Sequence, residues 1–228
     1  MGTILSIETA TRSGSVAIHK SGNLVGMQQY DIDKSHSSLL HVMIDQVLQN
    51  SGTERTQLNA IAVSAGPGSY TGLRIGVSTA KGMCYALDIP LIAVNTLEAM
   101  AKQVANTTSE NISLCPMIDA RRQEVYCMML NRQMEVLKET EAVIIDEASF
   151  FEELNENRIV FFGDGSDKCR SVLLHGNAGF IGNIMPSARE IGELAYNKYV
   201  KGDFENLAYY EPFYLKEFRI IKSKKKQL

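Results

Sequence analysis

The sequence lacks the features that mark several specialised classes of protein. It has no tryptophan, 5 prolines and 4 cysteines among 228 residues, and none of the cysteines has Cys-x-x-Cys spacing. It also shows neither a signal sequence nor an apolar run long enough to cross a membrane. We therefore expect a globular cytoplasmic protein with reduced thiols, in which Cys84, Cys115 and Cys127 are buried within apolar runs.

An excess of positive charge is missing as well. The chain has 23 lysines and arginines against 26 aspartates and glutamates, for a formal net charge of −3. This balance argues against a surface that binds nucleic acid through its phosphates. The exception is Lys-Ser-Lys-Lys-Lys at residues 222–226, in the basic tail 222–228, for which we weigh a solvated chain end against contact with nucleic acid.

The first half of the chain has the pattern of an α/β unit. Apolar runs separated by turn residues predict a three-stranded antiparallel meander at its start. Apolar residues at three- and four-residue steps then predict an amphipathic helix over residues 35–50, with Ser35 as its N-cap. A strand, a glycine-rich turn and a second helix over residues 72–88 follow, and then one more strand and helix. A polar stretch at residues 106–111 marks a boundary between a lobe 1–106 and a smaller lobe 107–228.

The second half repeats the order of the first. Met-Ile-Asp-Ala-Arg-Arg at residues 117–122 corresponds to Ser-Ile-Glu-Thr-Ala-Thr-Arg at residues 6–12. Later, an apolar strand again runs into a Gly-x-Gly-Ser turn, at Gly163 and Gly165, as it does at Gly66 and Gly68. Two matches in the same order indicate an internal duplication, with two similar lobes that face each other across a cleft.

The glycine-rich turn Gly66-x-Gly68-x-x-x-Gly72 fails three known templates. It lacks the spacing and the lysine of a P-loop, and it lacks the third glycine of a dinucleotide fingerprint. Ser69 does not have the flanking glycines of a nucleophile elbow. Two alternatives stay open, a purely structural turn whose helix is capped by Ser69 or Thr71, and a weak anion contact at the helix N-terminus. The candidate nucleotide or anion contacts are Glu8, Thr9, Gly66, Gly68, Ser69, Asp119, Gly163 and Gly165.

The remaining polar candidates do not form a recognisable catalytic or metal site. His36 and His41 are five residues apart and point to different faces of a helix, so they do not form a chelating pair. Glu8 and Asp119 are either a pair of cleft carboxylates or acidic residues that close turns. We predict no catalytic residue and no metal ligand in this chain.

Several motifs together resemble the TsaB (YeaZ) family of tRNA threonylcarbamoyladenosine biosynthesis proteins. They are Ile-Leu-Ser-Ile-Glu-Thr-Ala-Thr near the start, Gly-Pro-Gly-Ser-Tyr-Thr-Gly-Leu-Arg-Ile-Gly at residues 66–76, and Glu-Pro-Phe-Tyr-Leu-Lys-Glu at residues 211–217. The resemblance implies an α/β fold of the duplicated actin-like ATPase class, related to ribonuclease H, with a mixed sheet and flanking helices in each lobe. It also implies a noncatalytic subunit that the transferase TsaD needs, together with TsaE, to modify position 37 of tRNAs that read codons starting with A.

The resemblance further implies which groups the chain binds. This sequence has no His-x-x-x-His pair of the kind that TsaD uses, so ATP and a metal ion are expected in partner subunits and no cofactor is expected to bind strongly to this chain alone. The expected partners are TsaD in a heterodimer, TsaE, a second copy of the chain when it is alone, and tRNA only through the complex. A membrane is not expected.

The family's partner surface corresponds to the two predicted helices 35–50 and 72–88. In this sequence the small residues of the second helix offer a groove, and apolar residues of the first helix offer side chains to fill another groove. The alternative is that these residues fill the protein's own core. A rival function, motivated by the two glycine turns, is an independent ATPase or small-molecule kinase that uses the interlobe cleft. The expected interface residues are His36, Leu39, Leu40, Met43, Val47, Arg74, Ile75, Gly76, Thr79 and Gly82.

Overall fold

The computed structural model describes residues 2–31 and 36–216, with the side chain of His36 left out. The predicted N-cap Ser35 and the basic tail 222–228 therefore lie outside the described residues. Among the described helices, none has the length and apolar character needed to cross a membrane.

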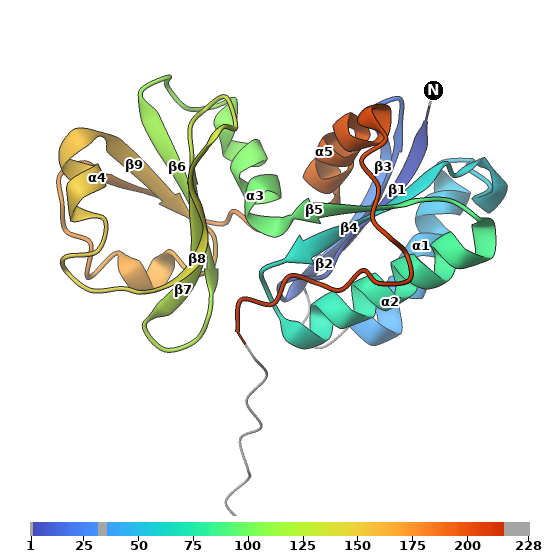
Figure 1. The fold of residues 1–228 in the computed structure, drawn as a ribbon, viewed down its shortest axis with the longest axis horizontal. Coiled ribbons are helices and arrows are strands. Elements are labelled where there is room, and N and C mark those ends of the chain that lie inside the picture. Colours follow the sequence, from blue (N-terminus) through green and yellow to red (C-terminus); the bar gives the residue numbers. More distant parts are fainter. Residues whose placement is uncertain (1, 32–35, 217–228) are drawn as a thin grey trace, which may run out of the picture.

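A five-stranded mixed sheet forms the first lobe (Figure 1). Its strands are β1 (Thr3–Glu8), β2 (Ser13–Lys20), β3 (Asn23–Asp31), β4 (Ala60–Gly66) and β5 (Leu91–Asn95). They lie in the order β3-β2-β1-β4-β5, with β1 antiparallel to β2 and parallel to β4. The register places Ile7 beside both Val16 and Val63, so apolar side chains from three strands share one face. The predicted meander and the strand after the first helix are thus confirmed.

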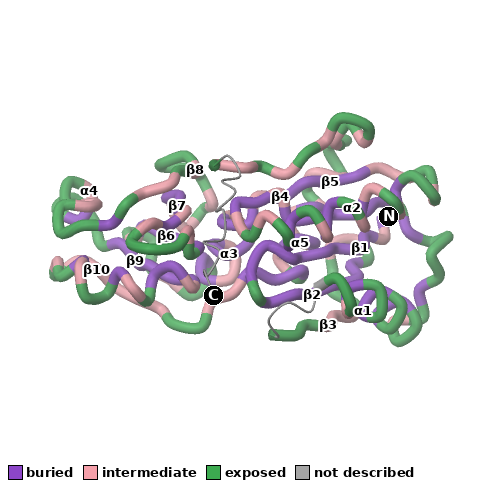
Figure 2. Tube along the Cα trace, turned by 90° about the horizontal axis from the view of Figure 1, so that it is seen from below, coloured by how far each residue is buried: buried purple, intermediate pink, exposed green. Residues whose placement is uncertain are grey.

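Three long helices cover this sheet. The helices α1 (His36–Asn50) and α2 (Tyr70–Leu87) pack on one face, where apolar residues of both join those of β1, β2 and β4 in one core. The other face is covered by α5 (Ala188–Lys201), with Ile191 and Ala195 against Ile4 and Ile92. Figure 2 shows β4 and β5 buried through the first lobe, whereas β3 at the sheet edge is largely exposed.

A second five-stranded sheet has the same plan. Its strands are β6 (Ile112–Asp119), β7 (Glu124–Leu130), β8 (Val136–Ile144), β9 (Arg158–Phe162) and β10 (Ala178–Ile181). The order is β10-β9-β6-β7-β8, again with an antiparallel meander and with parallel pairing of the first strand to the fourth. Leu114 lies between Leu130 and Val160 as Ile7 lies between Val16 and Val63. The predicted duplication of the strand order is confirmed.

The helices of the second lobe differ from those of the first. The helix α3 (Thr96–Ala105) follows β5 and packs mainly on the second sheet, where Leu97 and Met100 join Leu114 and Phe162. The short helix α4 (Phe151–Glu156) packs against β9 on the opposite face. Short 3-10 turns occur at Arg55–Gln57 and Asp167–Cys169.

The structure differs from the predicted division of the chain at residue 106. The predicted second lobe included residues 107–228, but α5 covers the first sheet. The amide of Ala188 donates to Ser15 Oγ at 2.8 Å, and Gly192 lies so close to His19 that a Cβ there would be 2.1 Å from its Nδ1. The apolar stripe of α5 indicates a buried face, but it does not say which sheet that face covers.

The segment 203–216, here called the strap, also returns to the first lobe. The amide of Glu205 donates to the Leu91 carbonyl at 2.9 Å, and the amide of Phe213 donates to the Ala65 carbonyl at 2.7 Å. Lys81 on α2 donates to the carbonyls of Ala208 (3.3 Å) and Tyr210 (3.0 Å). The strap therefore runs beside α2 before it reaches the second lobe (Figure 1).

All four cysteines are free and buried. Cys84 is on the buried face of α2 in the core of the first lobe, whereas Cys115, Cys127 and Cys169 share one core of the second lobe. Burial raises the pKa of the Cys84 thiol to about 12 and that of Cys169 to about 11. The prediction that Cys84, Cys115 and Cys127 are buried is confirmed.

Candidate functional site: the glycine turn and the helices that follow it

The glycine-rich turn between β4 and α2 packs tightly on the β1–β2 hairpin. A Cβ on Gly68 would lie 2.4 Å from the Ala10 carbonyl oxygen, and one on Gly72 would lie 2.0 Å from the Thr9 oxygen. Gly66 has a φ of +104°, in the range that favours glycine. The glycines are therefore required by the close approach of this turn to the chain's own backbone.

Two amides of this turn donate hydrogen bonds within the chain. The Ser69 amide donates to the Ala10 carbonyl at 2.6 Å, and the Gly72 amide donates to Ser69 Oγ at 3.2 Å. Ser69 is thus the N-cap of α2, one of the two caps that the sequence predicted. Since these two donors are used, the amides of Ser69 and Gly72 are not free to bind a phosphate.

Glu8 ends β1 directly beneath the turn and has no exposed surface. Its carboxylate accepts a hydrogen bond from the Ala10 amide. Burial raises the pKa of Glu8 to about 7, and hydrogen bonds from the Ala10 amide and Ser64 offset part of that effect. Glu8 is therefore enclosed by its own lobe and does not line an open cleft.

Asp119 ends the equivalent strand of the second lobe in a different environment. Its side chain is 47% exposed and forms an ion pair with Lys168. It also accepts a hydrogen bond from the Arg121 amide at 2.8 Å, while its own amide donates to Asp164. The structure thus does not form Glu8 and Asp119 into two carboxylates that face one substrate, which favours the alternative of residues that close turns.

The second glycine turn repeats the packing of the first. A Cβ on Gly163 would lie 2.2 Å from the Met117 oxygen, and the amide of Gly165 donates to the same oxygen at 3.1 Å. The following Asp164 is half-buried, and burial raises its pKa, with the negative charge of Asp119 adding to the effect. Each turn packs against the end of the first strand of its own sheet, β1 or β6. Among the described residues, no cluster of three or more metal-ligating side chains occurs.

Several residues predicted for a partner interface are buried in the protein's own core. Leu40, Met43 and Val47 have exposed fractions of 2%, 4% and 3% and pack on β1 and β2. A Cβ on Gly76 would lie 2.3 Å from Thr9 Oγ1, so Gly76 serves the contact between α2 and its own β1–β2 hairpin. For Leu40, Met43, Val47 and Gly76 these contacts favour the alternative that the residues fill the protein's own core, because the sheet beneath the helices uses this face.

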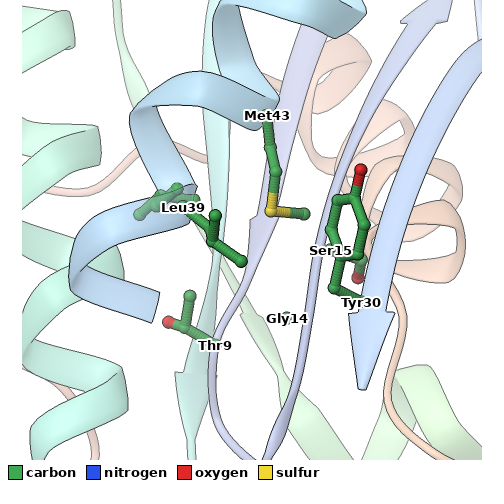
Figure 3. A pocket seen from close by; sticks show the side chains of 7 residues that line it. Thr9, Gly14, Ser15, Tyr30, Leu39 and Met43 are labelled. Atoms are coloured by element: carbon green, nitrogen blue, oxygen red, sulfur yellow. The ribbon is translucent and has the colours of Figure 1, made fainter. Parts of the chain in front are cut away.

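A small cavity of about 10 Å³ marks this contact between α1 and the sheet (Figure 3). It has room for about one water molecule. Thr9 from the predicted anion site and Leu39 and Met43 from the predicted interface lie around it, together with Tyr30. Two sets of residues that the sequence assigned to different sites thus meet inside one lobe.

Other predicted interface residues remain accessible. Arg74 and Gly82 are exposed, and Leu39, Ile75 and Thr79 are half-buried. The guanidinium of Arg74 lies 4.7 Å from the centre of the Tyr70 ring. The side chain of His36 lies outside the described residues.

The sequence reasoning missed two exposed apolar residues on these helices. Val42 on α1 is 47% exposed and Tyr85 on α2 is 84% exposed. Both lie out of phase with the buried stripe of their helix, and that mismatch was the signal available in the sequence. We call Leu39, Val42, Ile75, Gly82 and Tyr85 the α1–α2 face.

Comparison with known families gives one matching family model, and it covers most of the chain. The model is described as "TsaD: tRNA N6-adenosine threonylcarbamoyltransferase" and matches residues 26–217.

Three similar proteins carry related names. A "tRNA threonylcarbamoyladenosine biosynthesis protein TsaB" of Haemophilus influenzae is 35% identical over 131 residues, which are 58% of this chain and 55% of that protein. The protein of the same name from Escherichia coli K12 is 30% identical over 224 residues, 93% of this chain and 94% of the relative. A Pseudomonas aeruginosa crystal structure, described as similar to peptidase YeaZ, superposes with a TM-score of 0.80 at 25% identity, over 95% of this chain and all of that one. The predicted fold of the duplicated actin-like class is confirmed.

Proposed function

The chain belongs to the TsaB family and takes part in tRNA threonylcarbamoyladenosine biosynthesis, and we propose that it does so as a noncatalytic subunit that binds the transferase TsaD. In this role it supports the transfer reaction at position 37 of the tRNA without contributing a reacting group. The tRNA is contacted through the complex.

The observation that carries this proposal is the α1–α2 face. Tyr85 presents 84% of its surface to solvent on a helix whose opposite face is buried in the core of the first lobe. Exposed aromatic rings flanked by small and apolar residues are typical of sites where partners bind, because burial of a ring contributes much of the binding free energy. Gly82 has open space around it, so a partner helix can approach α2 closely next to Tyr85.

The α1–α2 face is also the basis for the partners that we propose. We propose that TsaD occupies it in a heterodimer, that two copies of this chain pair through it when TsaD is absent, and that TsaE joins the heterodimer. ATP and a metal ion are used by the partner subunits, and the complex acts in the cytoplasm. The enclosure of Glu8 and the internal hydrogen bonds of both glycine turns support a subunit that binds no cofactor strongly by itself.

The second candidate function is an independent ATPase or small-molecule kinase. It is motivated by the two strand-to-glycine turns and by the carboxylates that end β1 and β6. Calorimetry of the isolated protein with ATP and magnesium distinguishes the two functions. Tight binding would favour the enzyme, and we expect binding too weak to measure.

Reconstitution tests the subunit proposal. TsaD, TsaE and the enzyme that makes threonylcarbamoyl-adenylate are incubated with unmodified tRNA, with and without this protein, and the modified adenosine is measured by mass spectrometry. We expect modification to depend on this protein. Equal modification in its absence would refute the role.

A substitution on the α1–α2 face tests where TsaD binds. Tyr85→Asp places a charge where an aromatic ring is buried in the proposed complex, so we expect at least about a tenfold loss of TsaD affinity, about 1.4 kcal/mol. The matched control is Leu174→Asp, since Leu174 is 81% exposed on the second lobe. Both affinities are measured by calorimetry, and equal effects of the two variants would exclude the α1–α2 face.

A further inference from the structure

An open hollow of about 670 Å³ lies on the second lobe where the chain enters α4. Phe150 and Phe151 line it together with the acidic residues Glu147, Glu152 and Glu153. The Phe151 ring is 56% exposed. A hollow with both phenyl rings and carboxylates suits a segment that carries apolar and cationic side chains side by side.

Two of the three carboxylates in this hollow can form an ion pair with a further basic residue. Glu153 already forms an ion pair with Lys138. Glu147 and Glu152 have no ion-pair partner within residues 2–31 and 36–216. The hollow therefore offers two uncompensated negative charges next to an exposed ring.

The described part of the chain ends at the end of the second sheet from which residues 145–150 lead to the hollow. Lys216 forms an ion pair with Glu124 at the start of β7, and its Nζ lies 5.7 Å from the centre of the Tyr126 ring. In the sheet, Glu124 lies opposite Ile144, the last residue of β8. Ile144 is 71% exposed and precedes Glu147 by three residues. Figure 1 shows the strap reaching β7 and β8 at this end of the sheet. We call Ile144, Glu147, Phe151 and Glu152 the β8–α4 surface.

We propose that residues 217–228 of the same chain dock on the β8–α4 surface. In their sequence the apolar residues Phe218, Ile220 and Ile221 precede the basic run 222–226. This order matches the surface, which begins with an exposed isoleucine beside Lys216 and continues to the acidic hollow. The 12 residues span up to roughly 40 Å when extended, which is enough to pass around the end of β8 and reach α4.

Charge complementarity favours this occupant over nucleic acid. The phosphates of a tRNA would be repelled by Glu147 and Glu152, whereas the lysines of the tail are attracted to them. In the docked arrangement Glu147 and Glu152 offset two of the four lysines of the tail, so the tail contributes less to the affinity for tRNA than a free basic segment would.

Cross-linking in the full-length protein tests the proposal. Ala148→Cys, which lines the hollow, is combined with Ser223→Cys in the tail, so that no glutamate or lysine is lost. The native cysteines are all buried and do not compete for the reagent. A short bis-maleimide is expected to give a product within one chain, identified by peptide mass spectrometry. The control pairs Ser223→Cys with Gln46→Cys, exposed on α1 of the other lobe, and is expected to give several-fold less product.

Charge reversal makes the test specific. Glu147→Lys with Glu152→Lys, added to the cross-linking pair, is expected to lower the yield several-fold, as is 1 M salt, which screens exposed charges. Equal yields at Ala148→Cys and Gln46→Cys, a product between two chains, or a yield insensitive to charge reversal would each overturn the proposal. A tail that cross-links at the hollow only after tRNA is removed would overturn it in favour of nucleic acid.

Discussion

Two titratable side chains of the first sheet, Glu8 and His19, have no access to solvent. Burial raises the pKa of Glu8 to about 7, whereas burial and the positive charge of Arg189 lower the pKa of His19 to about 4. The fold therefore favours the neutral form of both. As the pH rises between about 4.5 and 6.5, the contribution of Glu8 to stability decreases and that of His19 increases.

For Glu8 the stability effect weakens as the pH rises. The unfolded chain releases this proton above about pH 4.5 and the folded chain only near pH 7, so the folded state binds more protons between these values. Stability from this group is complete below pH 4.5 and falls by about 3 kcal/mol by pH 7. His19 acts in reverse, because its folded pKa is depressed, so its contribution is lost as the pH falls from 6.5 to 4.

Glu8→Gln is expected to remove the loss of stability that Glu8 causes as the pH rises. The variant should gain stability relative to the parent as the pH rises from 5 to 7.5, and urea unfolding at each pH measures it. Glu110→Gln is the matched control, because the Glu110 side chain is 76% exposed. The same pH dependence in the parent and in Glu8→Gln would contradict the raised pKa of Glu8.

At the scale of the element, the helix α2 contacts the glycine turn, the first sheet, the strap and the proposed partner surface. Its N-terminus is the glycine turn, its inner face packs on β4, and its outer face carries Tyr85. The strap lies along its flank through Lys81. A partner on α2 therefore binds next to a segment that reaches the second lobe at Lys216.

Lys81→Met is expected to loosen the strap without unfolding α2. Methionine keeps the length and helix propensity of the side chain but removes both bonds to the strap carbonyls, which costs about 1 to 2 kcal/mol. Hydrogen exchange should quicken at the amides of Glu205 and Phe213, which bond to the first lobe. Lys102→Met on α3 serves as the control, and unchanged exchange in Lys81→Met would show that Lys81 does not hold the strap.

At the scale of the whole molecule, the two lobes share a strand order but depend on each other through the chain end. The apolar face of β1, β4 and β5 is covered by α5, which follows the second sheet in sequence. Gln103 on α3 also donates to the Met185 carbonyl, at 2.6 Å, where the chain returns to the first lobe. The first lobe is thus not completed until residues near 200 have folded.

A chain ended at residue 187 is therefore expected to lose a cooperative first lobe. It exposes Ile4, Ile92 and Val94, and exposed apolar area of this kind costs roughly 25 cal/mol for each Å². Thermal unfolding by circular dichroism should show a broad transition, with aggregation in gel filtration. A chain ended at residue 216 keeps α5 and the strap and should unfold cooperatively. Cooperative unfolding of both chains would show that α5 is dispensable.

Much of this architecture could be predicted from the sequence. Period-two and 3.6-residue patterns located the strands and the helices of the first lobe, and the two matched hairpins and glycine turns indicated the duplication. The spacing of the turn at Gly66 also differs from three nucleotide and nucleophile templates, and that difference can be read directly from the sequence. These properties depend on residues close together in the chain, so the local pattern contains them.

The sequence by itself determined the elements, their order, the repeat of the sheet and the resemblance to a family. Only the tertiary structure decided which face of α1 and α2 is free, that Glu8 is enclosed while Asp119 pairs with Lys168, and that α5 and the strap complete the first lobe. An amphipathic pattern states that one face of a helix is buried but not by what, and Leu40, Met43 and Val47 fit a sheet as well as a partner. Contacts between residues far apart in the chain make that choice, and they exist only once the chain has folded.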